Sequence, residues 1–260
     1  MVNKKKGATQ VVVGVMMVKI ECYSNVGRVR EENEDTVLAL QFKVLGKPYW
    51  LGVVCDGVGG GEDGKYASSL VCKSIIDAIK TYELRGSAVL EDLASMVSYT
   101  LSKCNSTIYK KYAAVTGSVC GTTCSCIILD MKNYVTLHVG DSSVFGIRSC
   151  VYDKLTEDHT LTREKVLKGL ITEEEALVDP SRHTIIRAVG INKHLQVDVS
   201  DVKEHKHRGY LLTSDGYSEF LTMDRINEIY NGGLTLEDVA HEMLDLGQRD
   251  NLSAVFIKIK

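Results

Sequence analysis

Short, densely apolar runs recur along the chain, and most of them have the length of a β-strand. Residues 37–42 and 49–55 form two such runs separated by Gly46, Lys47 and Pro48, which predicts a hairpin. Residues 134–139 alternate apolar and polar positions, the pattern of a strand with one buried face. Further strands are predicted at residues 11–18, 122–129, 144–148, 195–202, 210–213 and 253–259.

Two longer segments, residues 67–82 and 90–108, place apolar residues at steps of three and four. This spacing predicts two helices, each lying on a sheet by one apolar face. Shorter helices are predicted at residues 223–230 and 236–246, the second with Thr235 as its N-cap. Because strands come in runs separated by pairs of helices, without βαβ alternation, we expect an α+β fold with antiparallel sheets.

Residues 156–187 differ from the segments around them because they are polar and helical only in short pieces. Within them, Thr172 and Glu175 fit a capping box, which marks the start of a helix. We expect this segment to be an insertion over the surface rather than a part of the core.

Composition narrows the class of protein. The chain has 260 residues, 44% hydrophobic and 25% charged, with a formal net charge of −3, the balance of an ordinary soluble protein. This length allows one large domain or two small ones. Without a long basic run, nucleic acid is not expected as a partner. No apolar run reaches the roughly 18 residues of a membrane span, so no membrane partner is expected either.

The N-terminus combines Lys4, Lys5 and Lys6 with the apolar stretch 11–18, as a signal peptide would, but no small-residue cleavage pattern follows. We therefore expect a strand preceded by a short basic tail. Met17 could itself begin the chain. Residues 1–16 are accordingly interpreted as an optional N-terminal extension, and residues 17–260 as a single domain.

The chain has eight cysteines and no CxxC motif. Cys120, Cys124 and Cys126 lie close together, but the CxxC knuckle and a histidine at the usual spacing are missing, so a zinc site there is disfavoured. Free thiols in a reducing cytoplasm are the better interpretation.

Carboxylates recur where predicted strands begin or end. A single Asp-Gly after a strand is usually only a turn, but several carboxylates in one cleft would repel one another unless cations lay between them. Oxygen ligands favour magnesium or manganese over zinc, and two such ions about 4 Å apart can clamp a phosphoryl group. The residues concerned are Glu34, Asp35, Asp56, Asp141, Asp215 and Asp250.

Arg30 precedes the first of these carboxylates in an otherwise acidic segment. A guanidinium binds phosphate oxygens in bidentate fashion, so Arg30 fits a single phosphate anchor beside a metal site. The common alternative is a solvated surface arginine.

The loop from Gly59 to Tyr66 suggests a different chemistry, since it nearly matches the phosphate-binding loop GxxxxGK[ST] between a strand and a helix. Tyr66 stands where the pattern needs a serine or threonine for magnesium, and Glu62 and Asp63 would repel nucleotide phosphates. A nucleotide hydrolase is therefore disfavoured. Glycines that let backbones approach closely near a metal explain the loop equally well.

Several short segments occur in the order found in one enzyme family. They are VGRVREENED, VVCDGVGGGEDGKYAS, GTT, HVGDSS, LTEDHT, TSDG and RDNLSAV. From about residue 19 to residue 260, the chain resembles the metal-dependent protein serine/threonine phosphatases, the protein phosphatase 2C-like (PPM) family. The likeness is greatest to its compact bacterial members.

The resemblance implies a fold and an activity. The fold is a β-sandwich of two antiparallel sheets flanked by pairs of α-helices, in four αββα layers, with residues 156–187 as a flap beside the active site of a single catalytic domain. The activity is Mn²⁺- or Mg²⁺-dependent hydrolysis of phosphoserine and phosphothreonine in proteins. Its nucleophile is a water bridging two ions, and no phosphoenzyme forms.

The resemblance also assigns roles to individual residues. Asp56 would bridge two metal ions and act in catalysis, and Gly57 would add its carbonyl. Asp215 and Asp250 would complete the protein ligands of the first ion. Glu34 and Asp35 would contact the metal ions through water. Asp141, with Asp215, would form a third, weaker metal site, and Arg30 would bind the substrate phosphate.

Three positions depart from the family pattern. Ser143 stands where an arginine is frequent, Val58 where some members have a histidine proposed as general acid, and Gly61 where many bacterial relatives have a histidine. None of these changes removes a metal ligand, so an active enzyme is expected. Its leaving group would take its proton from a metal-bound water or from another donor.

The expected partners are phosphoprotein substrates, with a cognate serine/threonine kinase as a candidate, and the expected state is a cytoplasmic monomer. Two alternatives stay open. One is a non-catalytic binding or regulatory domain with the same fold, and the other is a phosphatase of small phosphoesters.

Overall fold

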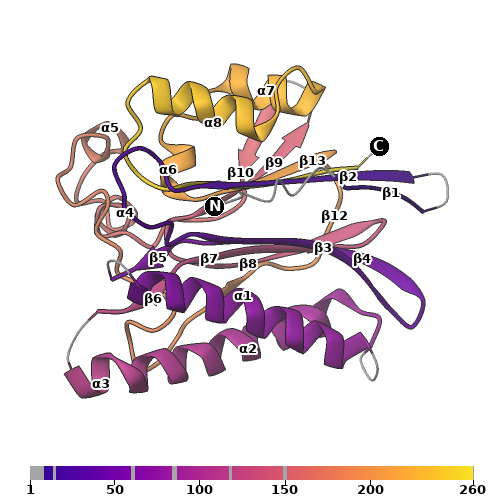
Figure 1. Cartoon of the computed structure of the whole chain (residues 1–260), viewed down its shortest axis with the longest axis horizontal. Helices are drawn as coiled ribbons and strands as arrows, with labels where there is room; N and C mark the ends of the chain where they lie inside the picture. Colours follow the sequence, from indigo (N-terminus) through magenta and orange to yellow (C-terminus); the bar gives the residue numbers. More distant parts are fainter. Residues whose placement is uncertain are drawn as a thin grey trace.

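Two antiparallel β-sheets lie face to face at the centre of the structure, with helices on both outer sides (Figure 1). The structure is a computed structural model and describes residues 9–13, 16–59, 62–83, 87–116, 119–148 and 151–259. The first sheet has the strand order β1 (Thr9–Val13), β2 (Met16–Asn25), β14 (Leu252–Ile259), β13 (Gly209–Thr213), β9 (Ser143–Arg148) and β10 (Val151–Lys154).

The second sheet contains the strands that lead into Asp56 and Asp141. Its order is β11 (Asp198–Val199), β8 (Asn133–Val139), β7 (Cys124–Leu129), β4 (Lys47–Cys55) and β3 (Thr36–Val44), and β12 (Lys203–Glu204) also pairs with β8. A small ladder joins β5 (Gly57–Val58) to β6 (Gly121–Thr122). The predicted hairpin is confirmed, because β3 and β4 pair antiparallel from Thr36–Cys55 to Val44–Lys47.

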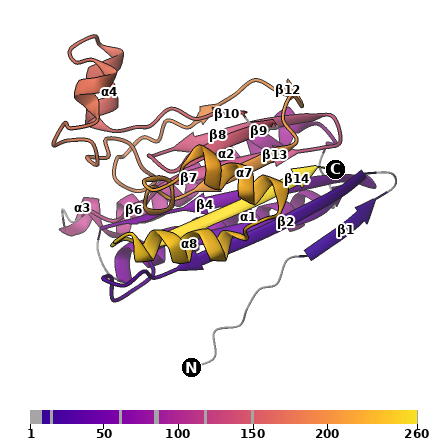
Figure 2. The same cartoon turned by 90° about the horizontal axis from the view of Figure 1, so that it is seen from above.

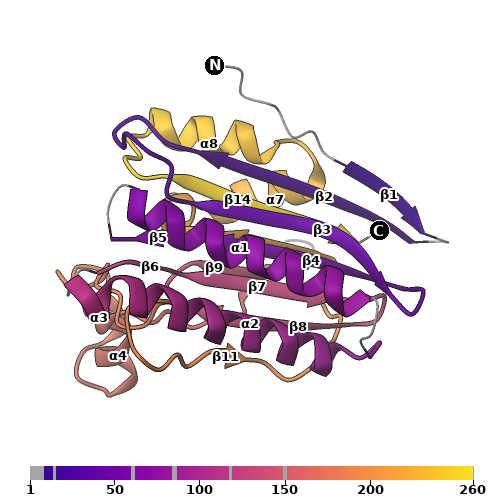
Figure 3. The ribbon, with the colours of Figure 1, turned by 60° about the horizontal axis from the view of Figure 1, so that its bottom comes forward.

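Helices cover the two outer faces of the sandwich. The long helices α1 (Glu62–Glu83) and α2 (Leu90–Lys111) lie side by side on the second sheet (Figure 3). The first sheet is covered by α7 (Met223–Asn231) and α8 (Leu236–Asp245). The predicted α+β sandwich with αββα layers is therefore confirmed. The shorter helices are α3 (Ala113–Thr116), α4 (Leu161–Leu167), α5 (Glu173–Ala176) and α6 (Asp215–Ser218).

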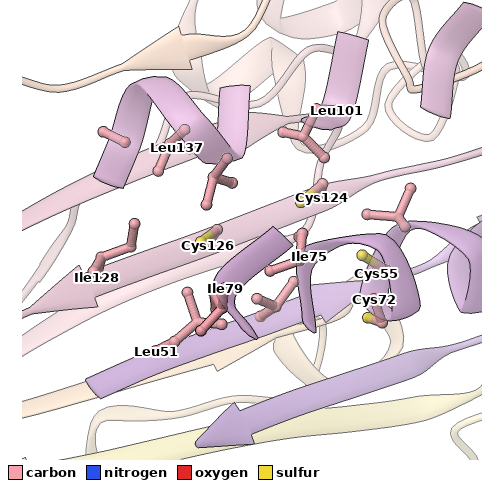
Figure 4. Packing of buried hydrophobic residues seen from close by; sticks show 14 of the residues in the cluster. Leu51, Cys55, Cys72, Ile75, Ile79, Leu101, Cys124, Cys126, Ile128 and Leu137 are labelled. Atoms are coloured by element: carbon pink, nitrogen blue, oxygen red, sulfur yellow. The ribbon is translucent and has the colours of Figure 1, made fainter. Parts of the chain in front are cut away.

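Three apolar clusters separate these layers. One lies between the sheets around Trp50, Ile127 and Tyr210. A second fills the space between α7, α8 and the first sheet. The third lies between the second sheet and the helices α1 and α2, where Leu51 and Ile75 pack beside several thiols (Figure 4). Burial of both faces of each sheet explains why the central strands are almost continuously apolar.

The cysteines are core residues. Cys55, Cys72, Cys124 and Cys126 are buried between the second sheet and its helices (Figure 4). Seven cysteines lie in the part of the chain that the structure describes and form no disulfide there, and Cys150 lies outside it.

Several predicted boundaries were wrong. The predicted strand 11–18 is instead two paired strands, β1 and β2, and residues 1–8 of the predicted extension lie outside the described residues. The predicted strand 195–202 is reduced to the two-residue β11. Strand β10 and helices α3 and α6 were not predicted. The capping boxes formed by Thr172 with Glu175, and by Thr235 with Asp238, are both present.

The polar segment 156–187 carries α4 and α5, and α4 lies apart from the sheets (Figure 2). Exposed apolar side chains in this segment agree with its expected position outside the core. As for membranes, none of the described helices is long and apolar enough to cross one.

Candidate metal and phosphate site

The predicted acidic residues meet at one end of the sandwich. Seven of the eight predicted site residues line a single cleft of about 860 Å³, and Asp35 alone does not. The carboxylates come from distant segments, since antiparallel strands that end at the same edge place remote residues side by side. The seven are Arg30, Glu34, Asp56, Gly57, Asp141, Asp215 and Asp250.

Asp56 occupies the turn between β4 and β5 and is held by two threonines. Its backbone N–H donates to Thr123 Oγ1 at 2.9 Å. Its carbonyl accepts from the Thr123 N–H at 2.8 Å and from the Thr122 hydroxyl at 2.9 Å. The Asp56 backbone is therefore fixed by the GTT segment, whose role the sequence alone did not show.

Asp215 and Asp250 come from adjacent turns. Asp215 is the first residue of α6, not a residue of a plain turn after β13 as its Asp-Gly pattern suggested. A Cβ at Gly216 would collide with the backbone carbonyl of Asn251, so α6 can start here only because residue 216 has no side chain. This close approach brings the two aspartates into the same cleft.

Asn251 is a site residue that the sequence did not single out. Its Oδ1 accepts from the Glu34 N–H at 2.9 Å, and its Nδ2 donates to the carbonyls of Val26 and Glu32 at 2.8 and 3.1 Å. One amide therefore ties the loop before β3 to the turn that carries Asp250. The RDN segment was the available signal, but it contained no hint of this partner.

The carboxylates are strongly perturbed by one another. Burial is the largest cause that raises the pKa of Asp35, the Ser253 and Ser214 hydroxyls oppose it, and the charges of Asp215 and Asp250 add to it, so that this pKa is raised to about 7. Burial and the charge of Asp215 likewise raise the pKa of Asp141 to about 8. Such a cluster is unfavourable as a set of bare anions.

Asp56 and Asp215 lie close enough to perturb each other, and burial, followed by the charges of Asp35 and Asp215, raises the pKa of Asp56 well above its usual value. Burial also raises the pKa of Asp215. A shared proton is the expected way for two buried carboxyl groups to coexist without a cation. A divalent cation could replace that proton.

A divalent metal ion fits the chemistry of this cleft. The Oδ1 of Asp141, a residue of the cleft, is buried without a hydrogen-bond partner. Both carboxylate oxygens of Asp35, which does not line the cleft, also lack a partner within hydrogen-bond geometry, although the Ser253 and Ser214 hydroxyls lie close enough to lower its pKa. Unpartnered buried oxygens are the donors that hard cations prefer. No described trio of His, Cys, Asp or Glu is yet arranged as a complete ligand set. Binding would therefore require these side chains to rotate.

Arg30 reaches the cleft as predicted, but its partner is a carboxylate. Its guanidinium donates to Asp250 Oδ2 at 2.8 Å. This hydrogen bond, opposed by burial and reinforced by nearby carboxylates, raises the pKa of Arg30. With its side chain 54% exposed, the guanidinium is free to reorient toward an incoming anion.

Val58 lines the cleft and can supply no proton, and Gly61 lies outside the described residues. His159 does not reach the cleft. It is buried, its Nδ1 accepts from the Gly140 N–H at 3.0 Å, and its Nε2 pairs with Asp198 at 3.0 Å. His183 is the one imidazole among the described residues that line the cleft.

The flap predicted at residues 156–187 borders this site. A groove of about 1100 Å³ runs between it and the sandwich, and the groove shares Asp141, His183, Asp215 and Glu219 with the acidic cleft. Ser143, the other departure from the family pattern, lines the groove.

A family model described as protein phosphatase 2C matches residues 28–252, the part of the chain that contains the whole cleft. The chain belongs to the protein phosphatase 2C family. The enzyme is therefore a protein phosphatase, and it shares the metal dependence that is general to this family.

Curated relatives and solved structures agree. The chain is 27% identical over 245 residues to a putative protein phosphatase 2C-type of Streptococcus pyogenes, covering 92% of this chain and 97% of that one. It is 28% identical to the serine/threonine phosphatase stp of Listeria monocytogenes, covering 89% and 92%. The crystal structure of Stp1 from Staphylococcus aureus has a TM-score of 0.77 at 25% identity and covers all of both chains. That of PstP/Ppp from Mycobacterium tuberculosis has a TM-score of 0.72 at 27% identity, covering 93% and 98%.

Proposed function

We propose that the enzyme hydrolyses phosphoserine and phosphothreonine in proteins with Mn²⁺ or Mg²⁺, using two ions and a third at a weaker site. The observation that carries this proposal is the convergence of buried, mutually repelling carboxylates and Arg30 in a single cleft. The relatives named serine/threonine phosphatases support the choice of substrate.

The proposed ligands are the groups that line the cleft, together with Asp35, which is buried close to Asp215 and Asp250. Asp56 would bridge the two ions, and Gly57 would contribute its carbonyl. Asp215 and Asp250 would hold the first ion. When bound, the ions supply positive charge for the phosphoryl oxygens and an acidified water for in-line attack on phosphorus. The remaining ligands would be Glu34 and Asp35, acting through water, and Asp141 with Asp215 at the weaker site.

Arg30 would bind the substrate phosphate. Its present partner, Asp250, is itself a proposed ligand, so occupation of the ligand site would remove the carboxylate that holds the guanidinium. Released, Arg30 offers two parallel N–H donors to a phosphate, a geometry that suits bidentate binding. The arginine would then orient the phosphoryl group before attack.

The leaving alkoxide needs a proton, and Val58 cannot provide one. His183 lines both the cleft and the flap groove, and it is the only imidazole among the described residues of the cleft. We place it as the candidate donor. The serine or threonine leaving group would take its proton from the imidazolium, which is regenerated from solvent.

The surroundings of the enzyme follow from the same reasoning. Free thiols throughout the described core suit a reducing cytoplasm. A phosphoprotein phosphatase in that compartment implies a serine/threonine kinase as its counterpart. We propose a monomer, since the site is built from this chain alone.

The test is phosphate release from para-nitrophenyl phosphate and from a phosphothreonine peptide, with Mn²⁺, with Mg²⁺ and with a chelator. We expect metal-dependent release from both, abolished in Asp56→Asn with the circular dichroism spectrum unchanged. Release from para-nitrophenyl phosphate alone would favour a phosphatase of small phosphoesters. No release with any metal from folded protein would favour a binding domain, and full turnover in Asp56→Asn would refute the ligand assignment.

A further inference from the structure

The Glu34–Asp35 dipeptide lies in an irregular loop before β3, although it carries two of the proposed ligands. Its N–H groups are held by asparagine side chains. Glu34 N–H donates to Asn251 Oδ1 at 2.9 Å, and Asp35 N–H donates to Asn33 Oδ1 at 3.1 Å. The position of the two carboxylates therefore depends on side-chain contacts rather than on a β-ladder.

The two carbonyls of the dipeptide are held by the first turns of α1. Ser68 Oγ donates to Glu34 O at 2.6 Å, and Lys65 Nζ donates to Asp35 O at 2.6 Å. Lys65 and Ser68 are three residues apart, so they lie on the same face of the helix. All four backbone polar groups of the dipeptide are thus satisfied, two of them from one helix.

The start of α1 packs closely against the Glu34–Asp35 dipeptide. A Cβ at Gly57 would lie 2.5 Å from the Gly64 carbonyl carbon and 2.8 Å from Glu34 O. A Cβ at Gly64 would collide with the carboxylate of Glu34. Gly57 and Gly64 therefore allow close packing of three backbone segments. The close packing of Gly64 against Glu34 places the neighbouring Lys65 within reach of the Asp35 carbonyl.

Lys65 does not line the acidic cleft, so its ammonium is not a substrate contact. It is half-buried, and its Nζ also lies 3.4 Å from Thr36 Oγ1 at the start of β3. Burial lowers the pKa of Lys65, while the nearby charge of Asp35 opposes this change. A half-buried lysine that donates to a backbone carbonyl acts on the position of that carbonyl.

We propose that Lys65 is a positioning residue for the metal site: together with Ser68, it fixes the carbonyls of Glu34 and Asp35 so that the two carboxylates stay directed at the acidic cluster. The inference rests on the proposed function, because it assigns a role toward the ions that the carboxylates would hold. It also explains the near match to a nucleotide-binding loop, whose lysine here binds protein backbone.

The test compares Lys65→Met, which removes the charge and the donor at similar volume, with Lys65→Arg, which keeps both. Lys73→Met is the matched control, because Lys73 is an exposed lysine two turns further along α1. Mn²⁺ affinity is measured by isothermal titration calorimetry on the metal-free proteins. Phosphatase activity against Mn²⁺ concentration is the second measurement, with melting temperature in chelator as the check of folding.

We expect Lys65→Met to bind Mn²⁺ about 10-fold more weakly, the lower end of the loss typical for groups that orient metal ligands. Its kcat at saturating Mn²⁺ should approach the wild-type value. Lys65→Arg should recover most of the affinity, and Lys73→Met should match the wild type. Ser68→Ala removes the other carbonyl donor and is measured in parallel, so that a poorly folded Lys65→Met does not end the test.

Two results would overturn the inference. One is wild-type Mn²⁺ affinity in both Lys65→Met and Ser68→Ala. The other is a loss of melting temperature in Lys65→Met with unchanged affinity of the folded fraction, which would make Lys65 purely structural. Failure of the wild-type protein to bind Mn²⁺ or to hydrolyse para-nitrophenyl phosphate would instead contradict the proposed function.

Discussion

His138 is expected to make the protein sensitive to mild acid. It lies on β8, fully enclosed by the second sheet and the base of the flap, and its Nδ1 is 2.9 Å from Ser125 Oγ. The Ser125 hydroxyl proton is donated to the Ser142 carbonyl at 2.7 Å. His138 Nδ1–H must therefore be the donor to Ser125, which leaves Nε2 as the site where an added proton would place a buried charge.

The magnitude follows from the pKa of His138. Burial, followed by the nearby His159 and Lys154, lowers this pKa from 6.5 to about 3, while Asp198 and the Glu157 carbonyl act in the opposite direction. Because the folded pKa is depressed, the unfolded chain binds more protons between pH 6.5 and pH 3. The neutral, buried His138 therefore makes its full contribution to the stability of the fold above pH 6.5, and this contribution is lost as the pH falls. By pH 5 the loss is about 2 kcal/mol, at about 1.4 kcal/mol per pH unit.

The measurement is urea unfolding in chelator between pH 7.5 and pH 5, followed by the fluorescence of Trp50, the buried single tryptophan of the chain. His138→Asn keeps a polar atom near Ser125 and removes the titration. His241→Asn, at an exposed position of α8, is the control. We expect the free energy of unfolding of the wild type and the control to fall by about 2 kcal/mol more than that of His138→Asn. Equal pH slopes in all three proteins would refute the reasoning.

Three further outcomes are expected. Arg30→Ala should chiefly raise KM for the phosphothreonine peptide, because a ground-state phosphate contact is removed; a fall in kcat with KM unchanged would contradict this. His183→Asn should slow the phosphothreonine peptide more than para-nitrophenyl phosphate, whose phenolate leaves without a proton; equal losses would exclude His183 as the donor. Mn²⁺ at about 100 times its dissociation constant should stabilise the fold by about 2.7 kcal/mol in thermal melts, and an unchanged melting temperature would show that no ion binds the native protein.

The sequence predicted the elements whose signal is local. Apolar runs predicted the hairpin of β3 and β4, and apolar residues at helical spacing predicted α1 and α2. Thr235 caps α8, as its side chain suggested. The strand predicted at residues 195–202 was largely wrong, because an apolar run does not show whether a partner strand is available. At that edge of the second sheet, β8 pairs only with the two-residue strands β11 and β12.

The site shows the same division between local and remote signals. Each ligand candidate could be found from the sequence, because a carboxylate beside a strand end is a local pattern. The groups that hold them could not. Asn251 bonds to Glu34, which lies 217 positions away, and Lys65 bonds to Asp35 across a helix start. Nothing in the neighbourhood of an asparagine or a lysine specifies such a remote carbonyl or N–H partner.

A buried chain of hydroxyl groups connects His138, whose protonation destabilises the fold, to the acidic cleft. Ser125 joins His138 to the Ser142 carbonyl, and Thr123 Oγ1 joins Ser142 Oγ at 2.5 Å to the Asp56 N–H at 2.9 Å. The turns bearing Asp56 and Asp141 are therefore held by the same network, against the mutual repulsion of their carboxylates. Because the same hydroxyls hold both turns, loss of this network should loosen both turns at once.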